Sequence, residues 1–188
     1  MARAKSPEKR QAILEAAVRE IAEAGLSAST ATIARAAGLA EGTMFTYFSS
    51  KDDLLNELYV ELKTEVYLRI HADFPFEYGL RERARHVWVE YLRWAMENPE
   101  ERKVSVLLNL SSVVSVLTRE RIKAERGAVA QTMEELGQHG AFKNLPHGFA
   151  SAAMVAMQEA VLEMAAKKPR QKLMLVEQVF DAFWRMVE

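Results

Sequence analysis

The sequence contains no cysteine among its 188 residues. This absence excludes disulfide bonds, thiolate metal sites and thiol-based catalysis, and it is typical of proteins from a reducing compartment. The sequence also lacks an uninterrupted apolar run of about 18 residues, which is the length that a membrane-spanning helix needs. The basic residues near the first position are not followed by the apolar stretch of a signal peptide. We therefore expect a cytoplasmic protein with no membrane partner.

Residues that break regular structure are scarce, with five prolines and eight glycines against 49% hydrophobic residues. Such a composition predicts an ordinary globular protein with a sizeable core and no repeats. Signatures of catalysis are absent too, because there is no Gly-x-Ser-x-Gly, no Walker loop and no His-Glu-x-x-His. The four histidines are dispersed without the spacing of metal ligands: His71, His86, His139 and His147. We expect no enzyme, no metal and no cofactor.

The formal net charge is only −1, which by itself argues against binding to a polyanion. The charge is unevenly distributed, however, because residues 1–51 contain seven Lys or Arg against five Glu. The N-terminal segment is therefore positive by about two charges and the remainder is negative. Positive charge is concentrated in the part of the chain where a nucleic acid would have to bind.

Three helices are predicted in the first fifty residues. Ser6-Pro7-Glu8 provides an N-cap, a proline at the first helical position and an acid in the first turn of a helix that Gly25 ends. Ser29-Thr30 begins a short second helix, which Gly38 ends in a left-handed conformation. A third short helix follows from Glu41. Two short helices joined by a glycine turn form the unit whose last helix enters the major groove of DNA.

The rest of the chain is predicted to be helical as well. Ser50 caps a long fourth helix that ends near Asp73, and Asn98-Pro99 is a cap followed by a proline at the start of another helix. The run Val104–Leu117 is rich in valine and serine, which suits a strand, but the absence of a turn signal favours one buried helix. Further breaks are expected near Thr118 and at three segments: 74–79, 137–148 and 167–169. We expect an all-α protein of about nine helices.

The segment from Ile33 to Leu54 reads IARAAGLAEGTMFTYFSSKDDL and resembles the signature of the TetR/AcrR family of transcriptional regulators. The resemblance extends to the Ala16-Ala17 pair and to the turn at Gly25. It implies a helix-turn-helix DNA-binding domain over residues 1–50. It also implies a helical domain over residues 51–188 that binds an effector and dimerises.

The resemblance places the DNA contacts on the second and third helices, at the start of the fourth and on a basic N-terminal arm. Hydroxyls, backbone N–H groups and lysines contact phosphates, and side chains at the tip of the third helix face base edges. The expected DNA-binding residues are Thr30, Glu41, Gly42, Thr43, Tyr47, Lys51, Arg3 and Lys5. For Tyr47 the alternative is a partly buried core position, and for Lys51 it is a solvated helix end.

Three residues depart from the family pattern. Ala40 stands where a capping serine or threonine is frequent, which costs about 1 kcal/mol of helix stability. Phe45 stands where tyrosine is frequent, so a hydroxyl that could reach a phosphate is missing. Glu41 is an acid close to DNA, which is favourable if it accepts from a cytosine amino group and unfavourable if it faces phosphates.

Aromatic residues on the fourth and fifth helices either line a ligand cavity or fill the core. Ser105, Asn109 and Ser112 share one helical face, which forms either a polar wall of a pocket or a weakly solvated outer surface. We expect a small amphipathic or aromatic effector. The residues expected to contact it are Tyr59, Leu62, Val66, Trp88, Tyr91, Asn109 and Met154.

The last two helices carry more apolar surface than one subunit needs. In the resembled family the same pair of helices from a second subunit covers this surface and forms a four-helix interface. The alternative is that the two helices close their own domain. The residues expected at the dimer interface are Phe149, Ala153, Met157, Val161, Val176, Phe180, Phe183 and Trp184.

The sequence thus predicts a ligand-responsive transcriptional repressor. It would bind an inverted-repeat operator in double-stranded DNA as a homodimer and leave it when an effector binds. The alternative is a DNA-binding activator or adaptor that has no small-molecule effector.

Overall fold

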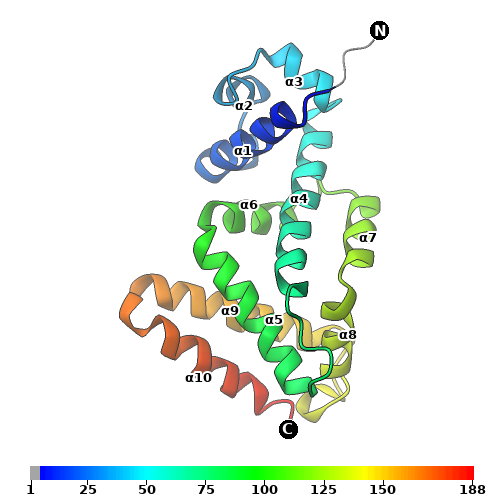
Figure 1. Ribbon diagram of the computed structural model, residues 1–188, viewed down its shortest axis with the longest axis vertical. Coiled ribbons are helices and arrows are strands. Elements are labelled where there is room, and N and C mark those ends of the chain that lie inside the picture. The colour runs from blue at the N-terminus through cyan, green and yellow to red at the C-terminus, as the bar shows by residue number, and fades with distance from the viewer. Residues whose placement is uncertain (1–4) are drawn as a thin grey trace. The chain divides into compact units, whose positions relative to one another are not determined.

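The computed structural model describes residues 5–188. These residues form ten α-helices and no strand, which confirms the all-α class (Figure 1). The helices are α1 (Pro7–Ala24), α2 (Thr30–Ala36), α3 (Glu41–Tyr47), α4 (Lys51–His71), α5 (Leu80–Glu97), α6 (Pro99–Leu110), α7 (Val116–Glu125), α8 (Gly127–Leu136), α9 (Phe149–Lys167) and α10 (Lys172–Trp184). Three short 3-10 segments accompany them: η1 (Gly25–Ser27), η2 (Gly140–Phe142) and η3 (Pro169–Gln171).

The chain divides into two compact units. Unit 1 contains the described residues up to Glu65 together with Asn98–Ile122, and unit 2 contains Val66–Glu97 and Lys123–Glu188. Unit 1 therefore holds α1, η1, α2, α3 and α6, and both α4 and α7 contribute residues to each unit. The domain boundary expected after residue 50 lies inside unit 1.

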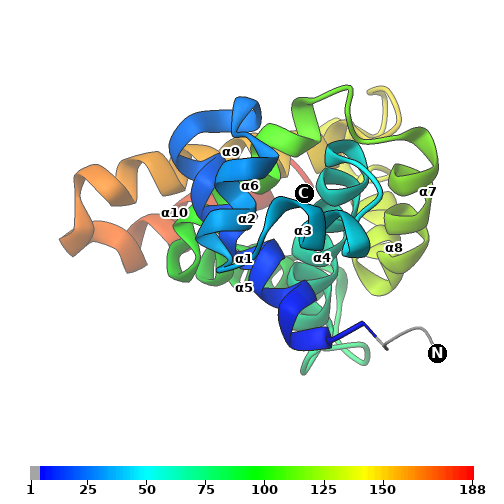
Figure 2. The same ribbon diagram turned by 90° about the horizontal axis from the view of Figure 1, so that it is seen from above.

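In unit 1, α1 packs against α2 and α6, and α2 packs against α3; α2 and α3 lie beside α1 in both views (Figures 1 and 2). The hydroxyl of Ser6 accepts the N–H of Lys9 at the start of α1, and Gly25, with φ +72°, ends the helix as expected. Apolar residues recur at helical spacing along α1, so that one face enters the core. The residues that α1 buries are Ile13, Leu14, Ala16, Ala17, Val18, Ile21 and Ala22.

The prediction of one helix over Val104–Leu117 is wrong, because α6 ends at Leu110 and α7 begins at Val116. Serine hydroxyls replace the helical hydrogen bonds in between. The hydroxyl of Ser111 accepts the N–H of Val113, and that of Ser115 accepts the N–H of Thr118. Serine offers the backbone this alternative wherever tertiary contacts favour a turn.

Two other details differ from expectation. The break expected near Thr118 lies slightly earlier, between Leu110 and Val116, and a further break that was not expected falls at Gly127, whose φ of +46° separates α7 from α8. The start of α6 after Asn98 is as expected, but the Asn98 side chain does not cap the helix.

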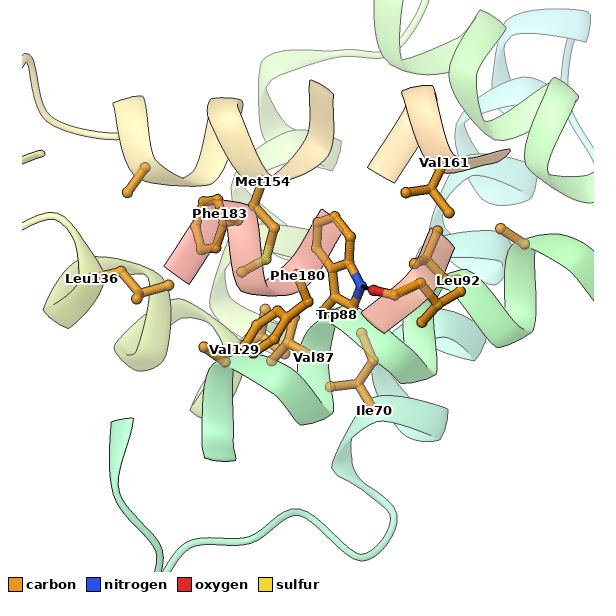
Figure 3. Packing of buried hydrophobic residues seen from close by; sticks show 14 of the residues in the cluster. Ile70, Val87, Trp88, Leu92, Val129, Leu136, Met154, Val161, Phe180 and Phe183 are labelled. Carbon is orange, nitrogen blue, oxygen red and sulfur yellow. Dashed lines mark hydrogen bonds between the residues drawn. The ribbon is translucent and has the colours of Figure 1, made fainter. Parts of the chain in front are cut away.

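Unit 2 is built on a core that α5, α9 and α10 supply, with α8 beside them. Trp88 lies fully buried at its centre, stacked on Phe183 with ring centroids 6.3 Å apart (Figure 3). Its indole N–H donates to the carbonyl of Val176 at 2.9 Å. Gln158, 3% exposed, donates to the carbonyl of Trp88 at 3.4 Å. The polar side chains of Trp88 and Gln158 are thus hydrogen-bonded to backbone, as burial requires.

α9 and α10 are joined by η3 and pack against one another (Figure 1). The last residues then lie against η2, where the N–H of Ala141 donates to the carbonyl of Met186 at 2.8 Å. Gly140 permits this approach, because a Cβ at that position would lie 2.3 Å from the Met186 carbonyl oxygen.

Candidate nucleic-acid interface

The turn between α2 and α3 depends on Gly38. Its φ is +71°, and its N–H and that of Leu39 donate to the carbonyls of Arg35 and Ala34, which closes the end of α2. A left-handed residue at this position suits glycine because no Cβ meets the backbone. Met44 and Phe48 are buried, at 0% and 2% exposure, and hold α3 in the core of unit 1.

The outward face of α3 is open. Glu41, Gly42, Phe45 and Thr46 are exposed, and Phe45 retains 41% of its surface. A Cβ on Gly42 would meet nothing within 4 Å, so the helix surface is bare there. Ala40 precedes α3 without a side-chain cap, as expected.

The first residue of α2 and the first turn of α3 are joined by a side-chain hydrogen bond from the Thr30 hydroxyl to a Glu41 carboxylate oxygen. Both residues were predicted to contact DNA, and the structure brings them together. The bond fixes the carboxylate on the exposed side of the turn and engages the proton of Thr30. The backbone N–H groups of α2 stay at the same helix N-terminus, where an anion is favoured.

Tyr47 and Lys51 both make contacts within unit 1. The Tyr47 hydroxyl oxygen accepts the N–H of Ser6 at 3.1 Å, which ties the end of α3 to the start of α1. The Lys51 Nζ donates to the carbonyl of Leu26 at 2.7 Å. An ammonium has three donors, so this bond leaves Lys51 able to meet a phosphate. The role of both residues in binding DNA stays a prediction.

The ends of α1 and α4 carry further polar contacts. Ser50 caps α4 by accepting the N–H of Asp53 at 3.0 Å. The Ser6 hydroxyl donates to the carboxylate of Glu8 and thereby lowers the pKa of that group below its ordinary value. Of the predicted N-terminal arm, Lys5 is exposed, and Arg3 lies outside the described residues.

Arg10 links α1 to α4. Its guanidinium pairs with Glu57 at 2.9 Å and Glu61 at 3.5 Å, and it lies 5.7 Å from the centroid of the Phe48 ring. These contacts hold the helix that precedes the helix-turn-helix. The positive charge of Arg10 is therefore engaged by carboxylates of α4, although the sequence alone counts this residue among the basic residues of the N-terminal segment.

Sequence reasoning missed Asn56, which holds the turn between α6 and α7 to α4. Its amide nitrogen donates to the carbonyl of Val113 at 3.0 Å, and its oxygen accepts from the N–H of Ser115 and the hydroxyl of Thr118 at 2.9 and 2.7 Å. Lys103 on α6 donates to the carbonyl of Ala22 on α1 at 2.6 Å. The only signal in the sequence was that Asn56 carries the one amide side chain of α4.

The comparisons with known proteins agree with this geometry. The family model described as bacterial regulatory proteins, tetR family, matches residues 13–58. The chain is 30% identical to a tetR family transcription regulator from Shewanella sp. PV-4, with a TM-score of 0.81 over 94% of this chain and 96% of that one. The chain belongs to the TetR family of transcription regulators. A second TetR family regulator, from Marinobacter aquaeolei VT8, is 25% identical, with a TM-score of 0.78 over 93% of this chain and 95% of that one.

Curated relatives of this TetR-family chain match over a shorter stretch. The HTH-type transcriptional regulator YvdT of Bacillus subtilis is 40% identical over 73 residues, which is 36% of this chain and 38% of that protein. The chain thus matches well under half the length of that relative. Two structures of liganded proteins share the fold only. LfrR of Mycobacterium smegmatis, in complex with proflavine, is 19% identical with a TM-score of 0.68 over 96% of this chain and 98% of that one. FadR of Bacillus subtilis, in complex with stearoyl-CoA, is 20% identical with a TM-score of 0.69 over 92% of this chain and 96% of that one.

The residues expected to contact an effector are divided between the two units. In unit 1, Tyr59 and Leu62 are buried, and the Tyr59 hydroxyl donates to the Asn109 side chain at 3.2 Å. The expected polar face beside Asn109 is divided too, because Ser105 is buried in α6 whereas Ser112 is exposed in the turn that follows. In unit 2 the core contains Val66, Trp88 and Met154, with Tyr91 packed against it. Their contact with an effector stays a prediction.

The expected dimerisation residues fall into two groups. Val161, Val176, Phe180 and Phe183 are at most 9% exposed within the chain's own core, and their contact with a second copy stays a prediction. Ala153, Met157 and Trp184 are half-buried, and Phe149 is 47% exposed. The exposed side of α9 also carries Ala152, Ala156, Ala160 and Met164.

α9 is also long and apolar enough to cross a membrane, judged by length and composition alone, although 33% of its most apolar window is buried inside the protein. One such helix is weak evidence for a membrane span, because the core helix of a soluble protein passes the same test.

Proposed function

We propose that this TetR-family protein is a cytoplasmic, ligand-responsive repressor that binds an inverted-repeat operator as a homodimer. The observation that carries the proposal is the α2–α3 unit, in which a glycine turn presents the exposed face of α3. Such a helix fits the major groove, which admits an α-helix and displays a distinct pattern for each base pair. A two-fold dimer would place two copies of α3 at related half-sites.

Support for the dimer comes from the uncovered side of α9. Phe149 and Val155 are 47% and 49% exposed, and every exposed residue of the helix from Phe149 to Ala160 is uncharged. A contiguous exposed apolar face usually marks an interface with another protein or with a second copy. One flank of α10 is fixed elsewhere, because Asp181 and Glu177 pair with Arg81 and Arg85 of α5.

Support for an effector is less direct. Two proteins of the same fold were solved with an aromatic dye and a long-chain acyl-CoA, and unit 2 of this chain has an aromatic core. Suppose that the dimer has a second conformer in which the two copies of α3 are wrongly spaced for the half-sites. A ligand that binds better to this conformer must weaken operator affinity, by linkage.

The test begins with the purified full chain and fragments of genomic DNA. Bound fragments are sequenced, and we expect an enriched inverted repeat whose half-sites are about one helical turn apart or more. Failure to retain any duplex at low ionic strength would refute the proposal. Proflavine, stearoyl-CoA and a broad compound library are then tested for thermal stabilisation and for operator release. If no compound changes both, the effector part is abandoned and a regulator without an effector remains.

A further inference from the structure

We infer that Phe45 reads the methyl group of a thymine in each operator half-site. This inference rests on the proposed function, because it requires α3 to enter the major groove. It assigns base specificity to a residue whose side chain has no hydrogen-bonding group.

The position of Phe45 on α3 is the first reason. Met44 and Phe48 face inward and are buried, whereas Phe45 keeps 41% of its surface exposed. It lies one helical turn after Glu41 and three residues after Gly42, so that all three share the outward side of the helix. Because Gly42 has no side chain and open space around it, the backbone there allows close approach of a base edge to the ring.

The chemistry of the groove is the second reason. A phenyl ring gains from leaving water and can make no hydrogen bond to a phosphate or a base edge. Among the groups that base pairs display in the major groove, the C5-methyl of thymine is the apolar one. Phe45 therefore has one favourable partner on a base edge.

The alternative is that the ring only packs on the sugar-phosphate backbone. That contact is independent of sequence. The two cases differ in their response to the loss of a single methyl group, which the exchange of thymine for deoxyuridine provides without changing base pairing.

The experiment uses the full chain and its selected operator. Each symmetry-related pair of thymines is replaced in turn by deoxyuridine, and the Kd is measured at constant salt. For the wild type we expect one pair to weaken binding about fifteenfold, which is about fourfold per half-site, as for burial of one methyl group. For Phe45→Ala we expect weaker binding that no longer responds to this replacement. Phe45→Tyr keeps the ring and should keep the response, as should the neighbouring control Thr46→Ala.

Two results would overturn the inference. One is a wild type that binds every deoxyuridine operator as tightly as the unmodified one. The other is Phe45→Ala retaining the full penalty. In both cases the operator is still bound, so the proposed function survives. A protein that retains no duplex at all refutes both, and thermal unfolding of Phe45→Ala shows whether the variant is folded.

Discussion

The hydroxyl of Thr30 on α2 donates a hydrogen bond to the carboxylate of Glu41 on α3. The two residues were each expected to meet DNA separately, and their bond changes what each can do. A carboxylate held in one orientation is suited to accept from a single cytosine amino group, and it still repels the phosphates around it. We therefore expect Thr30 to position Glu41, and contact of Thr30 itself with DNA stays a prediction.

For this reason Glu41→Gln should affect specific and non-specific binding in opposite directions. Loss of the charge should tighten binding to unrelated duplexes. The amide oxygen of glutamine accepts a weaker, neutral hydrogen bond from the base than the carboxylate does, so the preference for the operator should fall by about 1 kcal/mol. Competition binding at one salt concentration measures both. Thr30→Val should lower the preference less, with little effect on unrelated DNA. Glu134→Gln, which removes an exposed carboxylate of α8, is the control. Equal gains for operator and unrelated DNA would show that Glu41 only repels.

Lys51 and Tyr47 should differ in their salt dependence. Lys51→Gln removes a cation, so the slope of log K against log salt should flatten by about 0.9 for each phosphate that this lysine neutralises. Tyr47→Phe is neutral and should weaken binding to all sequences with an unchanged slope. Titrations at several salt concentrations distinguish the two, with exposed Lys143→Gln as the control. An unchanged slope together with lower thermal stability would show that Lys51 stabilises the fold through its hydrogen bond to Leu26 and does not contact a phosphate.

The exposed side of α9 predicts the effect of a charge placed on it. Ala156→Arg should convert the protein to a monomer, because an unpaired charge cannot be buried in an apolar interface without a large cost. Operator affinity should fall with it. Light scattering gives the mass and a binding titration the affinity. Ala124→Arg, at an exposed position of α7, should change neither. A dimer that persists in Ala156→Arg would place the interface elsewhere.

Gly140 should be the most sensitive glycine of unit 2. An alanine there meets a positive φ of +48° and places its Cβ 2.3 Å from the Met186 carbonyl oxygen. We expect a loss of at least about 2 kcal/mol in the free energy of unfolding. Gly148→Ala is a matched control, because its φ is +85° but nothing lies within 4 Å of the added Cβ. Denaturant unfolding compares them, and equal losses would mean that backbone strain alone is responsible.

Removal of the Asn56 amide should release the turn between α6 and α7. Asn56→Ala abolishes the bonds to Val113, Ser115 and Thr118, and we expect a loss of about 2 kcal/mol at typical values per hydrogen bond. Hydrogen exchange should quicken in residues 111–118. Asn144→Ala, in an exposed loop, controls for loss of an asparagine. Unchanged exchange in the turn would show that packing of α6 and α7 suffices.

The N-terminal helices were predictable because their ends depend on neighbouring residues. Ser6, Gly25 and Gly38 act on the backbone next to them, so their identity alone indicates where α1 and α2 begin or end. The turn after Leu110 was not predictable in this way. Its serines are compatible with a helix, and the partner that favours the turn, Asn56, is more than fifty residues away in sequence.

The rotation of the last two helices could not be predicted either. The sequence of α9 is apolar on nearly every side, so no polar face indicates which side is exposed. Val161 lies in the core and Val155 is 49% exposed, although both are valines of the same helix. α10 buries Val176, Phe180 and Phe183 in the core, and its exposed Glu177 and Asp181 pair with arginines of α5 at 2.6 and 2.7 Å. Such exposed ion pairs add little stability and cannot be read from periodicity.

The uncharged exposed side of α9 affects how such a chain would select a second copy of itself for dimerisation. From Phe149 to Ala160 the exposed positions carry only phenylalanine, valine and alanine. The one charged residue of this stretch, Glu159, is half-buried and accepts from the Tyr91 hydroxyl at 3.3 Å, so attraction and repulsion between charges would contribute little to the choice of partner there. Selection against other regulators of similar build would then depend on shape, on whether one chain's large side chains meet another's alanines. Steric clashes alone would then exclude related chains whose bulky residues lie at different positions.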